Sequence, residues 1–377
     1  MAKRVILAVA GAGKTYHICH SIQPNKKNLI LAYTHENVGN INRELIEAHG
    51  HIPELTSVMT FDSFVYRFLV RPYEPTILQH FMCEEFVTKG ITLTEPPKQS
   101  IQVKPGEYRK NPNYSKKGTL GHYISKRGYY FNAKTKELVL EVKSKANSLI
   151  DKATFALNNF YDQVLIDEFQ DFRQFDFDLI IALSKRVDNI LLVGDYYQHS
   201  VSAINNSGKP FVAGIKKVLV SYDDFIESLK SNGFEVDTTT LVKSRRCPPN
   251  ICKYVTDNLG ISIEADNNHV GSVIWLGDNA QTILENDAVT KLVIKESDQY
   301  TFKSQNWSYS KGNTFDSACV ILTDNCDDLS NGEFKPNKLA SSTLNKLYVA
   351  MTRTQGDLFL LPFSAFQSMR QKYLKSS

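Results

Sequence analysis

The stretch 4-RVILAVAGAGKTYH-17 joins an apolar run to a glycine-rich loop and then to a helical pattern. Residues 4–10 predict a short strand buried on both faces, as in a parallel sheet that helices cover on both sides. In GAGKT (11–15), the glycines let backbone N–H groups curl around phosphates, and the N-terminus of the following helix adds partial positive charge. This strand, loop and helix predict an α/β fold with a nucleoside triphosphate site.

The residues of this loop have separate expected roles. Lys14 would reach the β and γ phosphates, and the Thr15 hydroxyl would ligate Mg²⁺. The usual pattern begins with glycine five residues before the second one, and this chain has Ala8 there. We expect the nucleotide to be bound by Ala8, Val9, Ala10, Gly11, Ala12, Gly13, Lys14 and Thr15.

A second stretch, 161-YDQVLIDEFQDF-172, ends an apolar run in adjacent carboxylates. Such groups are rarely buried unless they are paired or bound to a cation. Mg²⁺ prefers oxygen ligands and rarely takes a cage made only of protein groups. We expect Asp167 to hold the metal and Glu168 to orient and deprotonate an attacking water. The alternative is a polar loop where a strand reaches the surface.

The composition is that of an ordinary globular protein. The chain has 377 residues, 42% hydrophobic and 22% charged, which suggests two or three domains. Its net charge of +4 permits a nucleic-acid partner without requiring one. Its six cysteines form no CxxC pair, so we expect reduced, mostly buried thiols. No run approaches the ~18 apolar residues that span a bilayer, so we expect a soluble cytoplasmic protein without a membrane partner.

Alternating strands and helices predict two α/β domains with parallel sheets. We expect the first domain at 1–235 and the second at 236–377, with a connection near 221–237. In the first domain, we expect strands at 4–10, 28–33, 163–166 and 189–193, and helices at 37–48 and 172–184. In the second domain, we expect strands at 241–246, 272–276, 317–322 and 357–361.

An insertion at about 70–155 interrupts this alternation. Between residues 98 and 145, twelve Lys or Arg face three acids, which gives a net charge of +9. Aromatic residues lie among these charges, so the segment suits binding to a nucleic-acid backbone combined with base stacking. The alternative is a solvated basic face with tyrosines in a core. The basic residues that we select as contacts are Lys116, Lys117, Lys126 and Arg127.

The motifs together resemble those of superfamily 1 helicases of the UvrD/Rep/PcrA group. The resemblance extends over most of the chain. Eight segments match in order: GAGKT (11–15, motif I), LAYTHENVGNINREL (31–45, motif Ia), TFDSF (60–64, a TFHSF-like element), DEFQD (167–171, motif II), GDYYQ (194–198, motif III), SRRCP (244–248, motif IV), SKGNTFD (310–316, motif V) and LYVAMTRT (347–354, motif VI).

The resemblance implies a 3′→5′ motor that hydrolyses ATP with Mg²⁺ between two RecA-like sheets and moves on single-stranded DNA, including the tail of a tailed duplex. Gln170 and Gln198 would sense the γ-phosphate. Arg246 and Arg353 would act as arginine fingers, because guanidinium binds phosphate in a bidentate way and stays charged. The resemblance also implies strand contacts at Tyr33, His35, Thr60 and Phe61.

The chain departs from this family in four places. Only seven residues precede Ala8, where relatives have a Gln-bearing segment that recognises adenine, so the preference for ATP over GTP rests on the resemblance alone. The motif III tail is HSVSAINN (199–206) in place of an aromatic-rich segment, and Thr314 stands where many relatives have Glu. Only about 65 residues separate Arg246 from Lys311, which leaves no room for a large 2B subdomain.

Two functions therefore remain open. The first is a compact DNA translocase or helicase. The second is a regulatory ATPase subunit that senses nucleotide and DNA and switches a partner such as a nuclease, including in defence against phage, without unwinding.

Overall fold

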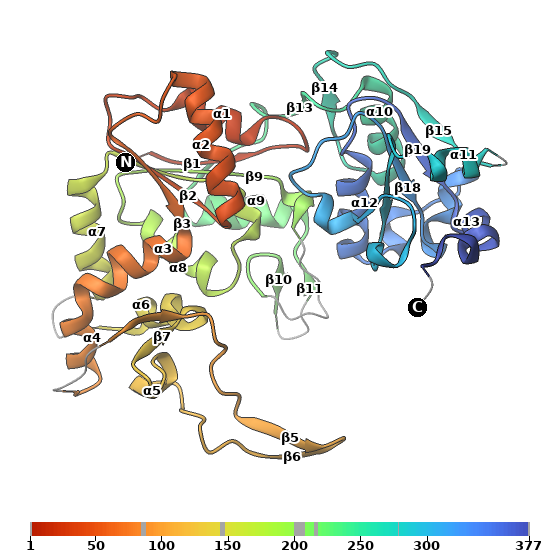
Figure 1. The fold of residues 1–377 in the computed structure, drawn as a ribbon. Helices are drawn as coiled ribbons and strands as arrows, with labels where there is room; N and C mark the ends of the chain where they lie inside the picture. Colours follow the sequence, from red (N-terminus) through yellow and green to blue (C-terminus); the bar gives the residue numbers. More distant parts are fainter. Residues whose placement is uncertain are drawn as a thin grey trace. The chain divides into compact units, whose positions relative to one another are not determined.

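The computed structural model of the protein describes residues 2–83, 88–143, 148–199, 208–214, 218–277 and 279–375. Lys145 of the basic insertion and residues 200–206 of the motif III tail lie outside the described residues. The chain divides into two compact units (Figure 1). The first unit is formed by Met1–Arg4, Ile18–Asp167 and Phe172–Leu192, and the second by Val5–His17, Glu168–Asp171 and Val193–Ser377.

The first unit carries most of a six-stranded sheet of order β12-β1-β9-β8-β2-β3. Within the unit, β2 pairs in parallel with β3 and β8, and β8 pairs in parallel with β9. The elements that lie wholly in this unit are β2 (Asn28–Ala32), α2 (His35–His49), β3 (Thr56–Thr60), α3 (Phe61–Phe64), α4 (Glu74–His80), β4 (Gly90–Thr92), β5 (Ser100–Lys104), β6 (Glu107–Lys110), α5 (Leu120–Tyr123), β7 (Tyr129–Phe131), α6 (Thr135–Glu141), α7 (Leu149–Phe160), β8 (Gln163–Ile166) and α8 (Phe175–Ser184).

Three elements run from one unit into the other: β1 (Ala2–Leu7), α1 (Lys14–Ser21) and β9 (Asn189–Gly194). The second unit adds β10 (Val212–Ala213), β11 (Val218–Leu219), α9 (Tyr222–Ser231), β12 (Glu235–Asp237), β13 (Lys243–Ser244), α10 (Pro249–Leu259), β14 (Glu264–Ala265), β15 (Val273–Trp275), α11 (Ala280–Glu285), β16 (Thr290–Val293), β17 (Ser304–Asn306), β18 (Ala318–Ile321), α12 (Ser341–Met351), β19 (Leu358–Leu361) and α13 (Phe363–Met369).

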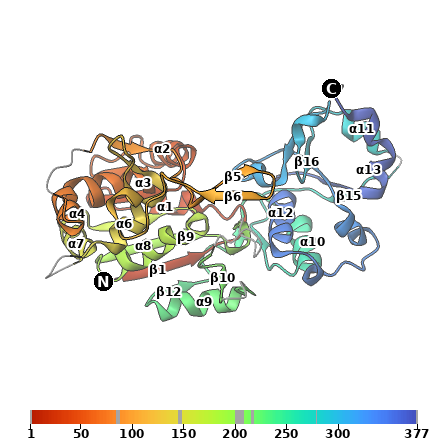
Figure 2. The same ribbon diagram turned by 90° about the horizontal axis from the view of Figure 1, so that it is seen from below.

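The sheet of the second unit is parallel throughout and has the order β15-β19-β18-β16-β17. Alternate residues of β18 enter two different cores, because successive side chains of a strand point to opposite faces. Ala318 and Val320 pack with α10 and α12, which lie side by side (Figures 1 and 2). Cys319 and Ile321 pack with α11 and α13. Helices therefore cover both faces of this sheet, and the α/β class with parallel sheets flanked by helices is confirmed.

Helix α2 shows how local sequence sets the bounds of an element. The Thr34 hydroxyl accepts a hydrogen bond from the backbone N–H of Asn37 at the helix start. Gly50 ends the helix with φ +78°, in the left-handed region that suits glycine. Ile41 and Leu45, one helical turn apart, are the buried positions between them. The prediction for 37–48 therefore matches a helix two residues longer at its start and one longer at its end.

The other predicted elements are present with shifted ends. Strand β1 begins at Ala2 and ends at Leu7, so residues 8–13 form a longer loop than expected. The strand predicted at 241–246 is reduced to β13, which pairs in parallel with β14. The sequence analysis missed β16, whose Lys291 interrupts the apolar pattern. Lys291 is fully buried, and its ammonium donates to the Asn286 carbonyl at 2.7 Å.

All six cysteines are free thiols and five of them are buried, which confirms the prediction of reduced, mostly buried thiols. Among the described residues, no helix combines the length and the apolar character needed to cross a lipid bilayer.

Candidate active site and nucleic-acid surface

The loop between β1 and α1 is shaped by two glycines with left-handed backbones, Gly11 (φ +73°) and Gly13 (φ +80°). A Cβ atom at Gly11 would lie 2.6 Å from the Ser244 hydroxyl oxygen and 2.8 Å from Cβ of Arg246. The backbone N–H of Arg245 donates to the Gly11 carbonyl at 2.9 Å. Glycine at position 11 is therefore required both by its φ angle and by the close approach of residues 244–246.

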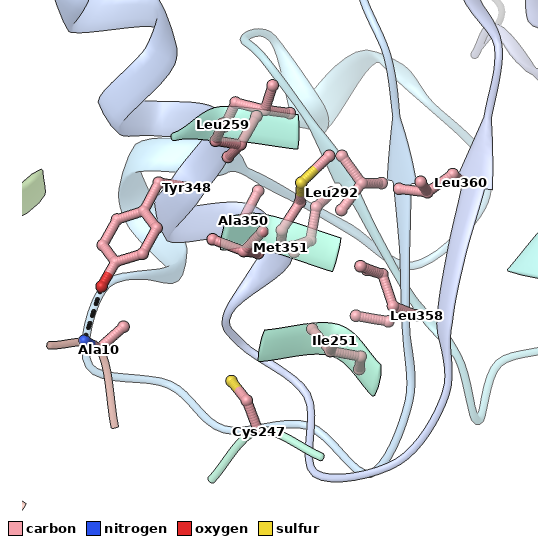
Figure 3. Close-up of a cluster of buried hydrophobic side chains, with 14 of the residues drawn as sticks. Ala10, Cys247, Ile251, Leu259, Leu292, Tyr348, Ala350, Met351, Leu358 and Leu360 are labelled. Atoms are coloured by element: carbon pink, nitrogen blue, oxygen red, sulfur yellow. Dashed lines mark hydrogen bonds between the residues drawn. The ribbon is translucent and has the colours of Figure 1, made fainter. Parts of the chain in front are cut away.

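Helix α12 is joined to the same loop through Tyr348. The backbone N–H of Ala10 donates to the Tyr348 hydroxyl at 2.8 Å (Figure 3). This hydroxyl in turn donates to Oδ2 of Asp195 at 3.3 Å. Tyr348 is fully buried, and burial raises the pKa of its hydroxyl well above the ordinary value. A neutral phenol thus links the phosphate loop, motif III and motif VI.

Glu168 lies between two lysines. Its carboxylate is 3.5 Å from the Lys14 ammonium and 3.6 Å from the Lys311 ammonium. Lys311 also donates to both oxygens of Asp171, at 2.8 and 2.7 Å. These four side chains come from motifs I, II and V and form one charged cluster within the second unit.

The pKa values of this cluster follow from burial and from the two lysines. Burial by itself raises the pKa of Glu168, but the charges of Lys14 and Lys311 and a hydrogen bond from Gln170 lower it to about 2. Burial raises the pKa of Asp171, against the opposing charge of Lys311. Glu168 is thus held ionised, and its φ of +51° places it in a backbone region that residues other than glycine rarely adopt.

Gln170 connects this cluster to motif III. Its side-chain amide donates to Glu168, and its carbonyl oxygen accepts from the backbone N–H of Asp195 at 2.9 Å. Gln198 lies on the other side of Asp195 and donates to its Oδ2 at 2.8 Å. Burial raises the pKa of the Asp195 carboxyl to about 6, although Lys14 and these donors oppose the shift.

The two arginines predicted as fingers lie in the second unit with different partners. Arg246 donates from Nε to the Thr314 hydroxyl at 2.9 Å and from Nη1 to the Thr352 carbonyl at 3.3 Å. Arg353 is buried and donates from Nε to the Val349 carbonyl at 2.9 Å. Burial and the neighbouring charge of Arg246 lower the pKa of Arg353 to about 10.

Arg353 also has an unsatisfied donor. Within the described residues, its Nη2 is buried and has no hydrogen-bond partner. A buried N–H without a partner costs about 1–3 kcal/mol. Its positive charge acts on Glu168, whose pKa it helps to lower. An anionic ligand beside Glu168 would supply the missing acceptor.

A cavity of about 520 Å³ adjoins the phosphate loop. Its lining includes Ala12 of the loop and Arg245 of motif IV. The guanidinium of Arg245 lies over the ring of Tyr16, 4.2 Å from the ring centre. The guanidinium of Arg245, a planar group, thus lines a space large enough for a nucleobase.

One predicted metal ligand lies at the start of a helix and the other at the end of a strand. Thr15 is in the first turn of α1, and Asp167 directly follows β8 and is fully buried. Asp167 belongs to the first unit and Thr15 to the second, so the metal site stays a prediction. Among the described residues, no cluster of three or more His, Cys, Asp or Glu side chains is grouped to hold a metal ion.

The residues predicted to contact a strand differ in accessibility. Tyr33 and His35 are exposed, and the Tyr33 ring packs edge-on against Phe172 at 5.3 Å. Thr60 caps α3 by accepting from the N–H of Ser63, and Phe61 is buried. The strand contacts of all four residues stay predictions. The side chains of Tyr33 and His35 are accessible to a strand, whereas those of Thr60 and Phe61 are engaged in helix capping and core packing.

The positive charge of the insertion is unevenly distributed. Lys117 pairs with Glu137 at 3.0 Å and with Glu141 at 3.7 Å, and Lys134 also pairs with Glu137 at 2.8 Å. Lys136 pairs with Asp62 and with Asp176. Of the four selected contacts, Lys117 is therefore largely neutralised. The other three, all exposed, have no carboxylate at ion-pair distance among the described residues: Lys116, Lys126 and Arg127.

The antiparallel hairpin of β5 and β6 extends away from α5 and β7 (Figure 1). Apart from Ile101, every residue from 100 to 110 is exposed. Lys104, Arg109 and Lys110 face a single acid, Glu107. A two-stranded hairpin without a core is marginally stable on its own, so this basic hairpin suits an anionic partner.

Sequence reasoning missed three residues of the site. Lys311 and Tyr348 lie within motifs V and VI, yet their partners, Asp171 and the backbone of Ala10, are far away in the sequence. Arg245 precedes the arginine that was selected and lies over Tyr16. The motifs marked the segments, but only the fold pairs these side chains with their partners.

A family model described as an AAA domain matches residues 2–203, which is more than half of the chain. No curated protein matches the sequence.

Two solved helicases align with the chain. The structure of the PRRSV helicase aligns with 99% of this chain and 55% of its own, at 14% identity and a TM-score of 0.43. The arterivirus nonstructural protein 10 (helicase), solved in complex with DNA, aligns with 97% of this chain and 62% of its own, at 12% identity and a TM-score of 0.44. The chain thus spans a little over half the length of these helicases.

Proposed function

The chain belongs to the AAA domain family, a helicase-type phosphate-loop family, and from this premise we propose that it is an ATP-dependent nucleic-acid motor. The finer proposal is a DNA helicase or translocase that hydrolyses ATP and moves 3′→5′ on single-stranded DNA. The assignment to the UvrD/Rep/PcrA group of superfamily 1 is part of this proposal and rests on the eight motifs. A cytoplasmic location is also part of the proposal, and so is the division into RecA-like domains at 1–235 and 236–377, with an insertion at about 70–155.

The observation that carries the proposal is the position of Glu168 beside Lys14. Lys14 belongs to the phosphate loop, and Glu168 is the carboxylate that would activate water. The distance of 3.5 Å between their charged groups supports the proposal, because the carboxylate that would act as the base lies next to the ammonium that would bind phosphate. Arg353, with a buried unsatisfied N–H, acts on the same carboxylate.

This geometry supports a hydrolysis mechanism. The backbone N–H groups of Gly11, Gly13 and Lys14, together with the Lys14 ammonium, would hold the β and γ phosphates. Once Lys14 pairs with phosphate, its charge no longer acts on Glu168 alone, so one of the three cations that lower the pKa of Glu168 is weakened and the carboxylate becomes more basic. It then takes a proton from the water that attacks the γ-phosphate. Glu168 would therefore be a stronger base when the nucleotide is bound than when the site is empty.

The remaining polar groups would stabilise the charge that moves during transfer. Arg246 and Arg353 would contact the phosphoryl oxygens, which supply the acceptor that Nη2 of Arg353 lacks. Gln170, already bonded to Glu168 and to the backbone of Asp195, would orient the water. Gln198 would transmit the state of the site through Asp195.

A magnesium ion fits this donor set. The Thr15 hydroxyl and the buried Asp167 carboxylate are oxygen donors, which Mg²⁺ prefers, and they would hold the ion together with the phosphates. When bound, the ion would neutralise part of the triphosphate charge. The base of the nucleotide would occupy the cavity beside Ala12 and Arg245.

The test is steady-state hydrolysis of ATP and GTP, with and without single-stranded DNA, by the wild type and by Lys14→Ala. We expect hydrolysis that single-stranded DNA stimulates and that Lys14→Ala abolishes. Displacement of 3′-tailed but not 5′-tailed duplexes would support the direction. Stimulation without displacement would favour a regulatory ATPase that acts on a partner such as a nuclease. A hydrolysis rate that single-stranded DNA leaves unchanged would contradict the proposed motor.

A further inference from the structure

A second cavity, of about 300 Å³, lies in the second unit on the opposite face of its sheet from α10 and α12. Its lining residues come from the segments that follow three strands: Lys295 and Glu296 after β16, Thr323 after β18, and Phe363 after β19. The cavity therefore lies at the carboxyl ends of these parallel strands.

The order of the strands shows that this position is a topological switch point of the sheet. Strands β16 and β18 are neighbours in the sheet. The chain leaves β16 towards β17 on one side and leaves β18 towards β19 on the other. The segments that follow the two strands thus diverge and open a crevice. In open α/β sheets, ligands bind in the crevice outside the carboxyl ends of the strands at such a switch point.

The chemistry of the lining suits a nucleotide. Lys295 and Arg370 line the cavity as cations, with Glu296 as the one carboxylate. Among the described residues, Arg370 has no carboxylate at ion-pair distance, whereas Lys295 lies 3.5 Å from Glu296 at an exposed position. Gln299 and Gln367 add amide groups, which can bond to the edge of a base.

The aromatic part of the lining is held in place. The Tyr300 ring stacks on Phe302 with ring centres 5.0 Å apart, and Phe366 packs edge-on against Tyr300 at 5.7 Å. The backbone N–H of Phe363 donates to Oδ1 of Asp327 at 2.5 Å. Phe363 is only partly buried, so its ring offers a stacking surface on a fixed backbone.

The loop after β16 is fixed in a strained form. Glu296 has a φ of +55°, although it is not a glycine. The next residue, Ser297, donates from its backbone N–H to Asn306 at 2.9 Å and accepts from the Ser304 hydroxyl at 2.7 Å. Backbone strain that neighbours maintain in this way is concentrated at ligand sites.

We propose that this cavity is a second nucleotide-binding site, which takes one nucleotide unit with its phosphate on Arg370 and Lys295 and its base against Phe363. The unit is either a free mononucleotide or one nucleotide of a bound strand. The strand form rests on the proposed function, whereas the free form does not.

The experiment compares Arg370→Ala, Phe363→Ala and a matched control, Lys372→Ala. Lys372 lies two residues from Arg370 but pairs with Glu285 at 2.8 Å, away from the cavity. In the first arm, fluorescence anisotropy measures binding of an oligothymidine of about 15 nucleotides. In the second arm, calorimetry measures how many equivalents of thymidine monophosphate each variant binds in a Lys14→Ala background, which weakens the phosphate-loop site.

If the site holds a nucleotide of a strand, Arg370→Ala lowers oligothymidine affinity about fivefold to tenfold and reduces the salt slope by about 0.7. Phe363→Ala lowers the affinity by about tenfold through loss of stacking. If the site holds a free nucleotide, the same variants remove one equivalent of bound monophosphate. Arg370→Lys, which keeps the charge, gives an intermediate loss in either case.

The proposal is overturned if both variants behave like Lys372→Ala in both arms while their thermal unfolding matches the wild type. Lys14→Ala separates this result from failure of the proposed function. It removes hydrolysis but leaves the effects of Arg370→Ala unchanged, because Lys14 does not line this cavity.

Discussion

The Tyr348 hydroxyl accepts a hydrogen bond from the backbone N–H of Ala10 at 2.8 Å, and this bond joins helix α12 to the phosphate loop (Figure 3). The same hydroxyl donates to Asp195 of motif III. One buried side chain thus connects three motifs that are far apart in the sequence. A nucleotide that orders the loop would be sensed directly at α12, which precedes Arg353.

Replacing Tyr348 by Phe tests this connection. The change leaves the buried N–H of Ala10 without an acceptor, so we expect the free energy of unfolding to fall by about 1–2 kcal/mol. Denaturant unfolding measures the loss. Tyr254→Phe is the matched control, because the Tyr254 hydroxyl is buried without a hydrogen-bond partner among the described residues. Equal losses in the two variants would mean that the bond to Ala10 contributes nothing specific.

Glu168→Gln tests the assignment of the base. The amide keeps the shape of the side chain but cannot accept the proton, so we expect kcat to fall by about 10²–10⁴-fold. Nucleotide affinity should persist, because Lys14 remains and has lost its ion pair with Glu168. Steady-state hydrolysis and equilibrium binding measure the two effects, with the exposed Glu333→Gln as the control. Full activity of Glu168→Gln would refute the role.

Arg353→Lys tests the arginine finger. Lysine keeps a positive charge but cannot bind phosphate in the bidentate way, so we expect kcat to fall, towards the ~10³–10⁵-fold loss typical when a finger is removed. The exposed Arg43→Lys in α2 is the control for the chemical change itself. A variant with normal kcat but weaker folding would assign Arg353 a structural role.

Asp195 predicts a pH dependence of stability. Burial raises the pKa of its carboxyl from 3.8 to about 6 in the folded protein. The folded state therefore holds this proton more tightly than the unfolded state. The protonated Asp195 carboxyl contributes fully to stability at pH values below its pKa in the unfolded chain. This contribution is lost as the pH rises through its pKa in the folded protein. The difference in unfolding free energy between wild type and Asp195→Asn should change by about 3 kcal/mol between about pH 4 and pH 7.

Chemical denaturation at a series of pH values measures that difference, since subtracting the Asn variant removes the contribution of other titrating groups. The wild type should lose stability relative to the variant as the pH rises. A difference that stays constant over this range, or one that changes in favour of the wild type, would show that Asp195 is ionised in the folded protein as readily as in the unfolded chain.

The exposed hairpin predicts a salt effect on nucleic-acid binding. Replacing Lys104, Arg109 and Lys110 by Ala should lower the slope of log affinity against log salt by about two for single-stranded DNA. The charge-matched control replaces three exposed lysines that have carboxylate partners: Lys230, Lys253 and Lys372. If the salt slope changes equally in both triple variants, the hairpin is a solvated basic surface without a specific role in nucleic-acid binding.

Much of the fold and part of the site were predictable from the sequence, because the signals were local. Apolar runs before GAGKT and DEFQD predicted β1 and β8, and the helix at α2 followed from its pattern. The strand β16 was missed because Lys291 is buried within it. A buried lysine is compatible with a strand only when an acceptor, here the carbonyl of Asn286, receives a hydrogen bond from its ammonium.

The distribution of charge was the least predictable feature. The sum of charges over the insertion could not distinguish Lys117, which Glu137 and Glu141 neutralise, from the basic hairpin residues, which have no carboxylate at ion-pair distance in the described part of the chain. The same limit applies to Lys311 and Tyr348. Their motifs were visible, but their partners depend on how the chain folds back.

The central claim is that a phosphate loop, an ionised Glu168 and two arginines of the second unit form one site for hydrolysis under the control of nucleic acid. The most direct test measures the rate of ATP hydrolysis by the full chain as single-stranded DNA is titrated, in the wild type and in Glu168→Gln. The account predicts a rate that rises to saturation in the wild type and stays near zero in the variant. A rate that DNA leaves unchanged, or that survives in Glu168→Gln, would contradict it.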